Sequence, residues 1–125
     1  MKTLLTPIIA ALLTILAPLS AADAADKTVY DMVGSNPGGA KGGYQGSVTL
    51  ETQGQLVKVT WTLADGSEVS GTGIITGDTM AVGYPSGRSY GVGIYRRDPA
   101  TEIVDGYWTL SGSTTFGTER WTPQR

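Results

Sequence analysis

The clearest pattern along the chain is an alternation of apolar and polar residues with a period of two. In the segment Val57–Leu63 every odd-numbered residue is apolar and every even-numbered residue is Lys or Thr. Successive side chains of a β-strand point to opposite faces, so this alternation predicts a strand with one buried face. Beyond residue 24, no stretch without glycine has the apolar spacing of an amphipathic helix. The pattern therefore predicts an all-β fold.

Comparable segments recur between clusters of Gly, Pro, Asp, Asn and Ser, which are typical of turns. Short connections join antiparallel neighbours, so the strands predict an up-and-down meander that closes into a small barrel. A β-sandwich is the alternative, although it usually needs a longer crossing connection. The expected strands, about eight, are Thr28–Val33, Tyr44–Glu51, Val57–Leu63, Glu68–Thr76, Thr79–Tyr84, Ser89–Arg97, Ile103–Leu110 and Phe116–Thr122.

Glycine is common inside these strands as well as between them. Gly71 and Gly73 stand in one expected strand, and Gly91 and Gly93 stand at equivalent places in another. Glycine within a strand indicates a bend, a bulge or the close approach of another group. We interpret these glycines as bends of a small barrel, with close approach of a backbone or ligand as the alternative.

The first residues have the pattern of a secretory signal peptide. Lys2 precedes an apolar run from Leu4 to Leu19, and Ala22-Asp23-Ala24 fits the small-residue cleavage motif. An uncleaved membrane anchor is the alternative, but the run is short and contains prolines. We expect a signal helix in residues 1–24, cleavage after Ala24 with Ala22 or Ala25 as alternative sites, and one β-barrel domain in residues 25–125. The mature chain would have no membrane span and would be periplasmic or secreted.

The composition excludes several kinds of chemistry. The chain contains no His and no Cys, which excludes catalysis by Ser-His-Asp or Cys-His groups, the usual zinc and copper ligands, and disulfides. The glycine-rich segments lack the spacing of phosphate-binding loops. The net charge is −2, with both signs mixed along the chain, so we expect no nucleic-acid partner. No metal or cofactor is predicted.

Carboxylates are the remaining candidates for acid–base chemistry. Most of the Asp and Glu residues lie in turns or on polar strand faces, where surface solvation explains them. Glu119 differs because it stands between Gly117 and Trp121 in the last expected strand. We expect Glu119 to form an ion pair with a buried Arg.

Aromatic residues are the remaining signal, and we interpret them as core residues, with a ligand pocket as the alternative. An eight-stranded barrel has room either for a packed interior or for one small ligand, and aromatic side chains suit both. Alternation places Trp108 with Val104 and Leu110 inside, and Tyr107 outside. Tyr95 is on the strand face opposite to that of the apolar residues Val92 and Ile94. It is therefore expected outside, in an exterior strip with Arg97 and Tyr107. The candidate binding residues are Tyr44, Trp61, Tyr84, Tyr95, Arg97, Tyr107, Trp108 and Glu119.

Short glycine and aromatic motifs also follow one another in a definite order over residues 28–123. They are Gly43–Val48, Val59–Trp61, Gly71–Ile74, Asp78–Tyr84, Tyr90–Tyr95, Gly106–Thr109 and Gly117–Glu119. This order resembles a family of small exported bacterial β-barrel proteins often labelled fibronectin-binding or left without an assigned function. The resemblance implies binding of a host-matrix protein such as fibronectin, and it assigns no binding residues. The meander is also similar in architecture to avidins and lipocalins, without a biotin-site or lipocalin signature.

These observations favour an exported, non-enzymatic binding protein whose partner is a protein or a small apolar ligand. Two alternatives are a barrel enzyme or isomerase that uses carboxylates and tyrosines, and a structural or envelope-stress protein. The enzyme hypothesis predicts a buried acid beside a polar cavity. The structural hypothesis predicts a filled barrel.

Overall fold

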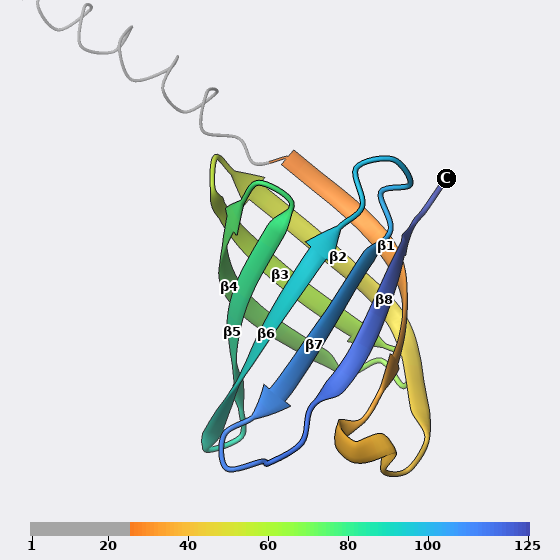
Figure 1. The fold of residues 1–125 in the computed structure, drawn as a ribbon, viewed down its shortest axis with the longest axis vertical. Helices are drawn as coiled ribbons and strands as arrows, with labels where there is room; N and C mark the ends of the chain where they lie inside the picture. Colours follow the sequence, from red (N-terminus) through yellow and green to blue (C-terminus); the bar gives the residue numbers. More distant parts are fainter. Residues whose placement is uncertain (1–25) are drawn as a thin grey trace, which may run out of the picture.

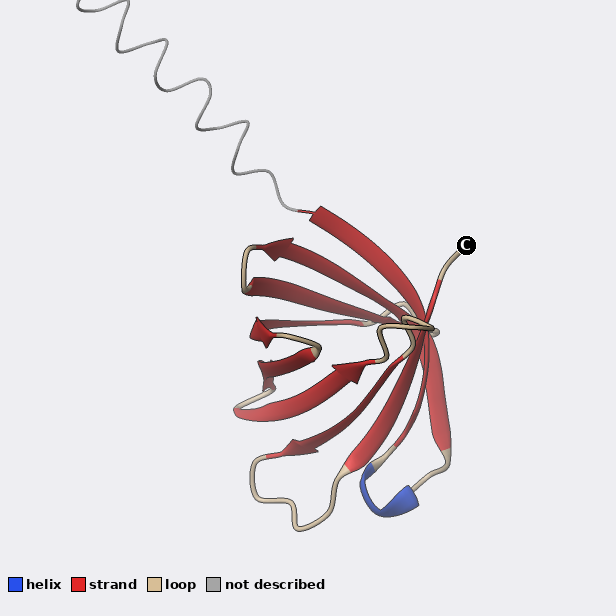
Figure 2. Ribbon diagram, turned by 45° about the horizontal axis from the view of Figure 1, so that its top comes forward, coloured by secondary structure: helices blue, strands red, loops and turns tan. Residues whose placement is uncertain are grey.

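Eight antiparallel strands form a closed barrel in the computed structural model, which describes residues 26–125 (Figures 1 and 2). The predicted all-β meander and barrel are confirmed, and the sandwich is not formed. The predicted signal peptide lies outside the described residues. The strands are β1 (Asp26–Ser35), β2 (Gly43–Gln53), β3 (Leu56–Leu63), β4 (Glu68–Thr76), β5 (Thr79–Ser86), β6 (Ser89–Arg97), β7 (Val104–Leu110) and β8 (Gly117–Pro123).

Every strand pairs with its neighbours in sequence, and β1 also pairs with β8. In the closing ladder Met32 lies opposite Trp121, and Tyr30 lies opposite Pro123. Figure 1 shows this seam where the orange β1 runs beside the blue β8. Because the sheet closes on itself, the barrel presents no unpaired strand edge.

Helical structure is confined to one short turn in the described part of the chain. This turn, η1 (Pro37–Gly39), connects β1 to β2. No helix in residues 26–125 is long and apolar enough to cross a membrane.

The middle of the barrel is filled by a core of large apolar side chains. Trp121, Val48 and Val59 are completely buried, and Met32 is nearly so. The ring of Tyr95 stacks on Trp121 with 4.4 Å between the ring centroids. An eight-stranded barrel has an interior of the width that such side chains fill. The absence of Cys from the chain is therefore compensated by packing rather than by cross-links.

The outer surface carries a row of apolar side chains that follows the cross-strand register. Leu56 lies opposite Ile74, Ala81 lies between Ile74 and Ile94, and Ile94 lies opposite Tyr107. The four large side chains of this outer row are each more than half exposed. Strand β6 thus places Val92 and Ile94 outward and Gly91 and Gly93 inward, the reverse of what hydrophobicity alone indicates for these four residues.

Candidate functional site

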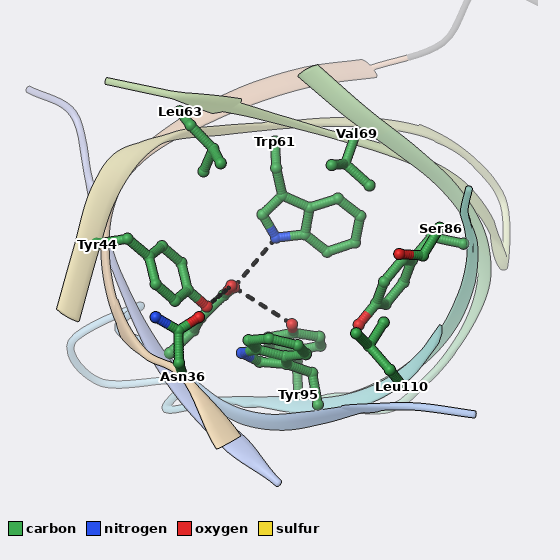
Figure 3. A pocket seen from close by; sticks show the side chains of 11 residues that line it. Asn36, Tyr44, Trp61, Leu63, Val69, Ser86, Tyr95 and Leu110 are labelled. Carbon is green, nitrogen blue, oxygen red and sulfur yellow. Dashed lines mark hydrogen bonds between the residues drawn. The ribbon is translucent and has the colours of Figure 1, made fainter. Parts of the chain in front are cut away.

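A pocket of about 290 Å³ lies inside the barrel at the end where β1–β2, β3–β4, β5–β6 and β7–β8 are connected. Figure 3 shows side chains from strands all around the barrel pointing into this space. Five of the residues that line the pocket are aromatic, and Glu119 is the sole charged residue among them. The lining residues are Asn36, Tyr44, Trp61, Leu63, Val69, Tyr84, Ser86, Tyr95, Trp108, Leu110 and Glu119.

Glu119 is the buried polar centre of the pocket, with 8% of its surface exposed. Its Oε1 accepts hydrogen bonds from the indole N–H groups of Trp61 and Trp121, at 3.1 and 2.9 Å, respectively. Oε1 also accepts a bond from the Tyr95 hydroxyl at 3.2 Å. Oε2 accepts one bond, from the Tyr44 hydroxyl at 2.5 Å. All four donors are neutral, so they satisfy the buried carboxylate without cancelling its charge.

The tyrosines around Glu119 are held in their protonated form. Burial, reinforced by the charge of Glu119, raises the pKa of Tyr84 to about 12. The same two causes raise the pKa values of Tyr44 and Tyr95 further above the ordinary value. A tyrosine with a raised pKa keeps its hydroxyl proton and remains a donor over the neutral range. The donor shell of the carboxylate is therefore stable to ordinary changes of pH.

The predicted partner of Glu119 was wrong, since the described side chains that bind it are tyrosines and tryptophans and none of the described ion pairs includes it. Alternation along β8 turns Arg120 outward, where its Nε donates to Asp105 Oδ1 at 2.7 Å. The other described ion pairs connect Arg97 to Asp78 and to Glu102 near the opposite end of the barrel. Neutral O–H and N–H groups thus take the place that a guanidinium was expected to fill.

Cross-strand glycines create the space in which the pocket aromatics lie. Tyr44 is directly opposite Gly34, Tyr84 is opposite Gly91, and Trp108 is opposite Gly117. A Cβ atom at any of these glycines would overlap the ring of its partner. The interpretation of strand glycines as bends is therefore incomplete, because several of them accept an aromatic ring.

Gly71 and Gly73 fit the alternative interpretation, the close approach of a neighbouring backbone. A Cβ at Gly71 would come within 2.8 Å of the Gly83 carbonyl oxygen, and a Cβ at Gly73 would come within 2.5 Å of the Ala81 oxygen. Here the neighbouring backbone, rather than a ring, occupies the space. The matching motif at Gly91 and Gly93 instead meets the rings of Tyr84 and Tyr95, so the two motifs have different structural roles.

Trp108 contributes a ring to the pocket wall but has an unpaired polar atom. Its Nε1 is buried and has no hydrogen-bond partner among the described residues. Its neighbour in the pocket wall is Tyr44. The two rings meet edge to face with 6.2 Å between their centroids. The Trp108 ring therefore packs against Tyr44 in the pocket wall.

The structure brings together six of the eight predicted binding residues. Arg97 is excluded because it lies by a second cavity, of about 240 Å³, toward the opposite end of the barrel. Tyr107 is on the outer surface, as alternation predicted, with 55% of its surface exposed. The predicted exterior strip was wrong for Tyr95, which is 2% exposed and points inward. Gly91 and Gly93 occupy inward positions of β6 and carry no side chain, so the sequence pattern did not show that Tyr95 shares this inward face. The six residues are Tyr44, Trp61, Tyr84, Tyr95, Trp108 and Glu119.

Five pocket residues were not among the predicted candidates. Leu63 and Leu110 had been placed on the inner face by alternation, so their position was predictable although their role was not. Val69 follows the same inward pattern one strand later. Asn36 lies in the connection that follows β1, and Ser86 is the last residue of β5, beyond the expected end of that strand at Tyr84, so neither had a periodic signal.

Among residues 26–125, no group of three or more Asp and Glu side chains is arranged to hold a metal ion. In comparisons with known proteins, no family model matches this chain and no curated protein matches it in sequence.

Proposed function

We propose that this chain is an exported, non-enzymatic binding protein that holds a small, largely apolar ligand in the pocket around Glu119. The observation that carries the proposal is an aromatic-lined pocket of about 290 Å³ with one buried polar centre. Ligand pockets are typically concave, mainly apolar, and equipped with a few polar groups that orient the ligand. The pocket fits that description at the small end of the size range.

Binding is favoured over catalysis by the character of the groups beside Glu119. A catalytic acid or base must exchange a proton near the working pH. The hydroxyl groups nearest to Glu119 belong to Tyr44 and Tyr95, whose raised pKa values keep them protonated. They are suited to orienting a carboxylate and a ligand. A catalytic function would instead require turnover that disappears in Glu119→Gln.

The test is a binding screen with a blocked pocket as its reference. A library of neutral, cationic and anionic fragments is examined by ligand-observed NMR and by thermal shift. Val69 lines the pocket, so Val69→Trp should fill it and abolish binding. Val33 is 56% exposed, so Val33→Trp adds the same bulk outside and should bind normally. The absence of any fragment that binds wild type but not Val69→Trp would contradict the proposal.

Export is a separate part of this proposal and rests on the signal-peptide pattern of residues 1–24. Fractionation of producing cells should place the protein in the periplasm or medium. N-terminal sequencing of that protein should begin at Ala25. Full-length chain retained in the cytoplasm would contradict export without bearing on the pocket.

Protein binding through the outer row is a second candidate function. The row of Leu56, Ile74, Ile94 and Tyr107 supports it, because large apolar side chains are gathered there on one exposed surface. Fibronectin is the protein to test, by surface plasmon resonance on the immobilised protein. Ile94→Asp should abolish that binding and leave pocket binding intact. Equal fibronectin binding by wild type and Ile94→Asp would exclude the outer row.

A further inference from the structure

We propose that the pocket selects an organic cation, a quaternary ammonium or protonated amine, over a neutral molecule of the same shape. This inference rests on the proposed function and specifies its ligand class. It follows from the charge, the remaining hydrogen-bonding capacity and the aromatic walls of the pocket.

The first step concerns charge. Glu119 is the sole ionisable acid or base among the lining residues besides the tyrosines, and no Lys or Arg lines the pocket. The described salt bridges involve Arg97 and Arg120, and neither contacts Glu119. The carboxylate therefore projects an uncompensated negative charge into a partly desolvated space, where electrostatic attraction exceeds that in bulk water. This charge attracts a cationic ligand and repels an anionic one.

The second step concerns the two oxygens of the carboxylate. Oε1 accepts three hydrogen bonds, whereas Oε2 accepts one, from Tyr44. An ionised carboxylate oxygen has two lone pairs, so Oε2 retains capacity for a second donor. A protonated amine can donate to Oε2, and a quaternary ammonium can pair with it by charge alone.

The third step concerns the walls. Trp61 and Tyr84 pack against each other on one side of the pocket, with 5.4 Å between their ring centroids and an angle of 60° between their planes. Tyr44 and Trp108 meet edge to face on another side. Aromatic faces carry negative electrostatic potential and bind alkylammonium groups through cation–π interactions. The aromatic walls and the buried carboxylate thus attract a cation in two ways that have no effect on a neutral molecule of the same shape.

The test compares charged and neutral probes of matched shape by isothermal titration calorimetry. Choline and 3,3-dimethylbutan-1-ol differ in one central atom, nitrogen or carbon, and therefore in charge. Benzyltrimethylammonium extends the series to a larger probe. We expect the cation to bind at least about tenfold more tightly than its neutral partner in wild type. We expect Glu119→Gln, verified to be folded by its thermal transition, to lose this preference.

A second variant tests the walls and does not depend on the folding of Glu119→Gln. Tyr84 does not hydrogen-bond to Glu119; its hydroxyl donates instead to the Thr109 carbonyl at 3.4 Å. Tyr84→Leu should therefore weaken choline more than 3,3-dimethylbutan-1-ol. Equal affinity for choline and its isostere in wild type, or binding of neutral fragments alone, would overturn the cation preference and leave the proposed binding function intact. Failure of neutral, cationic and anionic fragments alike would overturn both.

Discussion

The ring of Tyr95 lies across Gly106, the residue directly opposite it in the ladder between β6 and β7. The missing side chain at position 106 leaves room for the ring to lie flat against the barrel wall and to stack on Trp121. The Tyr95 hydroxyl then reaches Glu119. One glycine on β7 thus determines both the core stack and one of the donors to the carboxylate.

Gly106→Ala should destabilise the barrel by roughly 1–3 kcal/mol, because the new Cβ would overlap the Tyr95 ring and displace it. Urea denaturation measures the change. Gly83→Ala is the matched control, since a Cβ there meets a single atom, the Gly91 carbonyl oxygen, at 3.9 Å. The control should be neutral or slightly stabilising. Equal effects of the two substitutions would contradict the close packing of Tyr95 on Gly106.

Glu119→Gln and Glu119→Leu should differ sharply in stability. Gln retains one acceptor oxygen for the three donors at Oε1, and the Tyr44 hydroxyl can turn to accept from the new amide. Leu leaves the donors without an acceptor, at roughly 1–3 kcal/mol for each that stays buried. Thermal unfolding followed by circular dichroism should rank wild type first, Gln next and Leu last. A Leu variant as stable as the Gln variant would show that the hydrogen bonds contribute nothing.

Stability should decrease as the solution becomes strongly alkaline. The pKa of Tyr84 is raised from 10.0 to about 12 in the folded protein, so the folded state retains a proton that the unfolded chain releases. The stabilisation is complete below pH 10 and is lost as the pH rises from 10 to about 12. For one such tyrosine the free energy of unfolding decreases by about 1.4 kcal/mol per pH unit in this interval. Urea unfolding at several pH values in this interval measures the free energy of unfolding, which should decrease less steeply with pH in Tyr84→Phe than in wild type. An identical pH dependence in the two proteins would contradict the raised pKa of Tyr84.

Val59 and Ile94 should respond differently to the same replacement by threonine. Val59 is completely buried, so Val59→Thr places a hydroxyl in the core at a cost of roughly 1–3 kcal/mol. Ile94 is 53% exposed on the outer row, so Ile94→Thr should change the free energy of unfolding by less than about 0.5 kcal/mol. Chemical denaturation compares the two variants. A large loss in Ile94→Thr would place that side chain in the core instead.

The sequence was sufficient to predict the barrel because its period-two signal is local. The alternation in Val57–Leu63 and the short turns around it require only neighbouring residues, and the eight predicted strands match the observed ones closely. Strand β6 shows the limit of this reasoning. Gly91 and Gly93 face inward, while Val92 and Ile94 face outward. The rings of Tyr84 and Tyr95 fill the space inside Gly91 and Gly93, so these inward positions are glycine and do not contribute to a hydrophobic pattern.

The candidate site depends on contacts between residues far apart in the chain, which periodicity does not reveal. The unusual position of Glu119 was visible, but its partners Trp61 and Tyr44 lie 58 and 75 residues away. Ion pairing with Arg was the simplest expectation for a buried acid. The arrangement of four neutral donors becomes apparent only when the register of the closed barrel is known.

The seam between β1 and β8 also has a consequence for how the chain folds. Every other ladder joins strands adjacent in sequence, so each can form as a local hairpin with little loss of chain entropy. The seam joins positions such as Met32 and Trp121 and must close a loop that contains nearly the whole domain. Glu119 and Trp121 both stand in β8, so the carboxylate and its donors assemble only when this last strand docks. The arrangement of donors around Glu119 is therefore complete only when the barrel is closed at this seam.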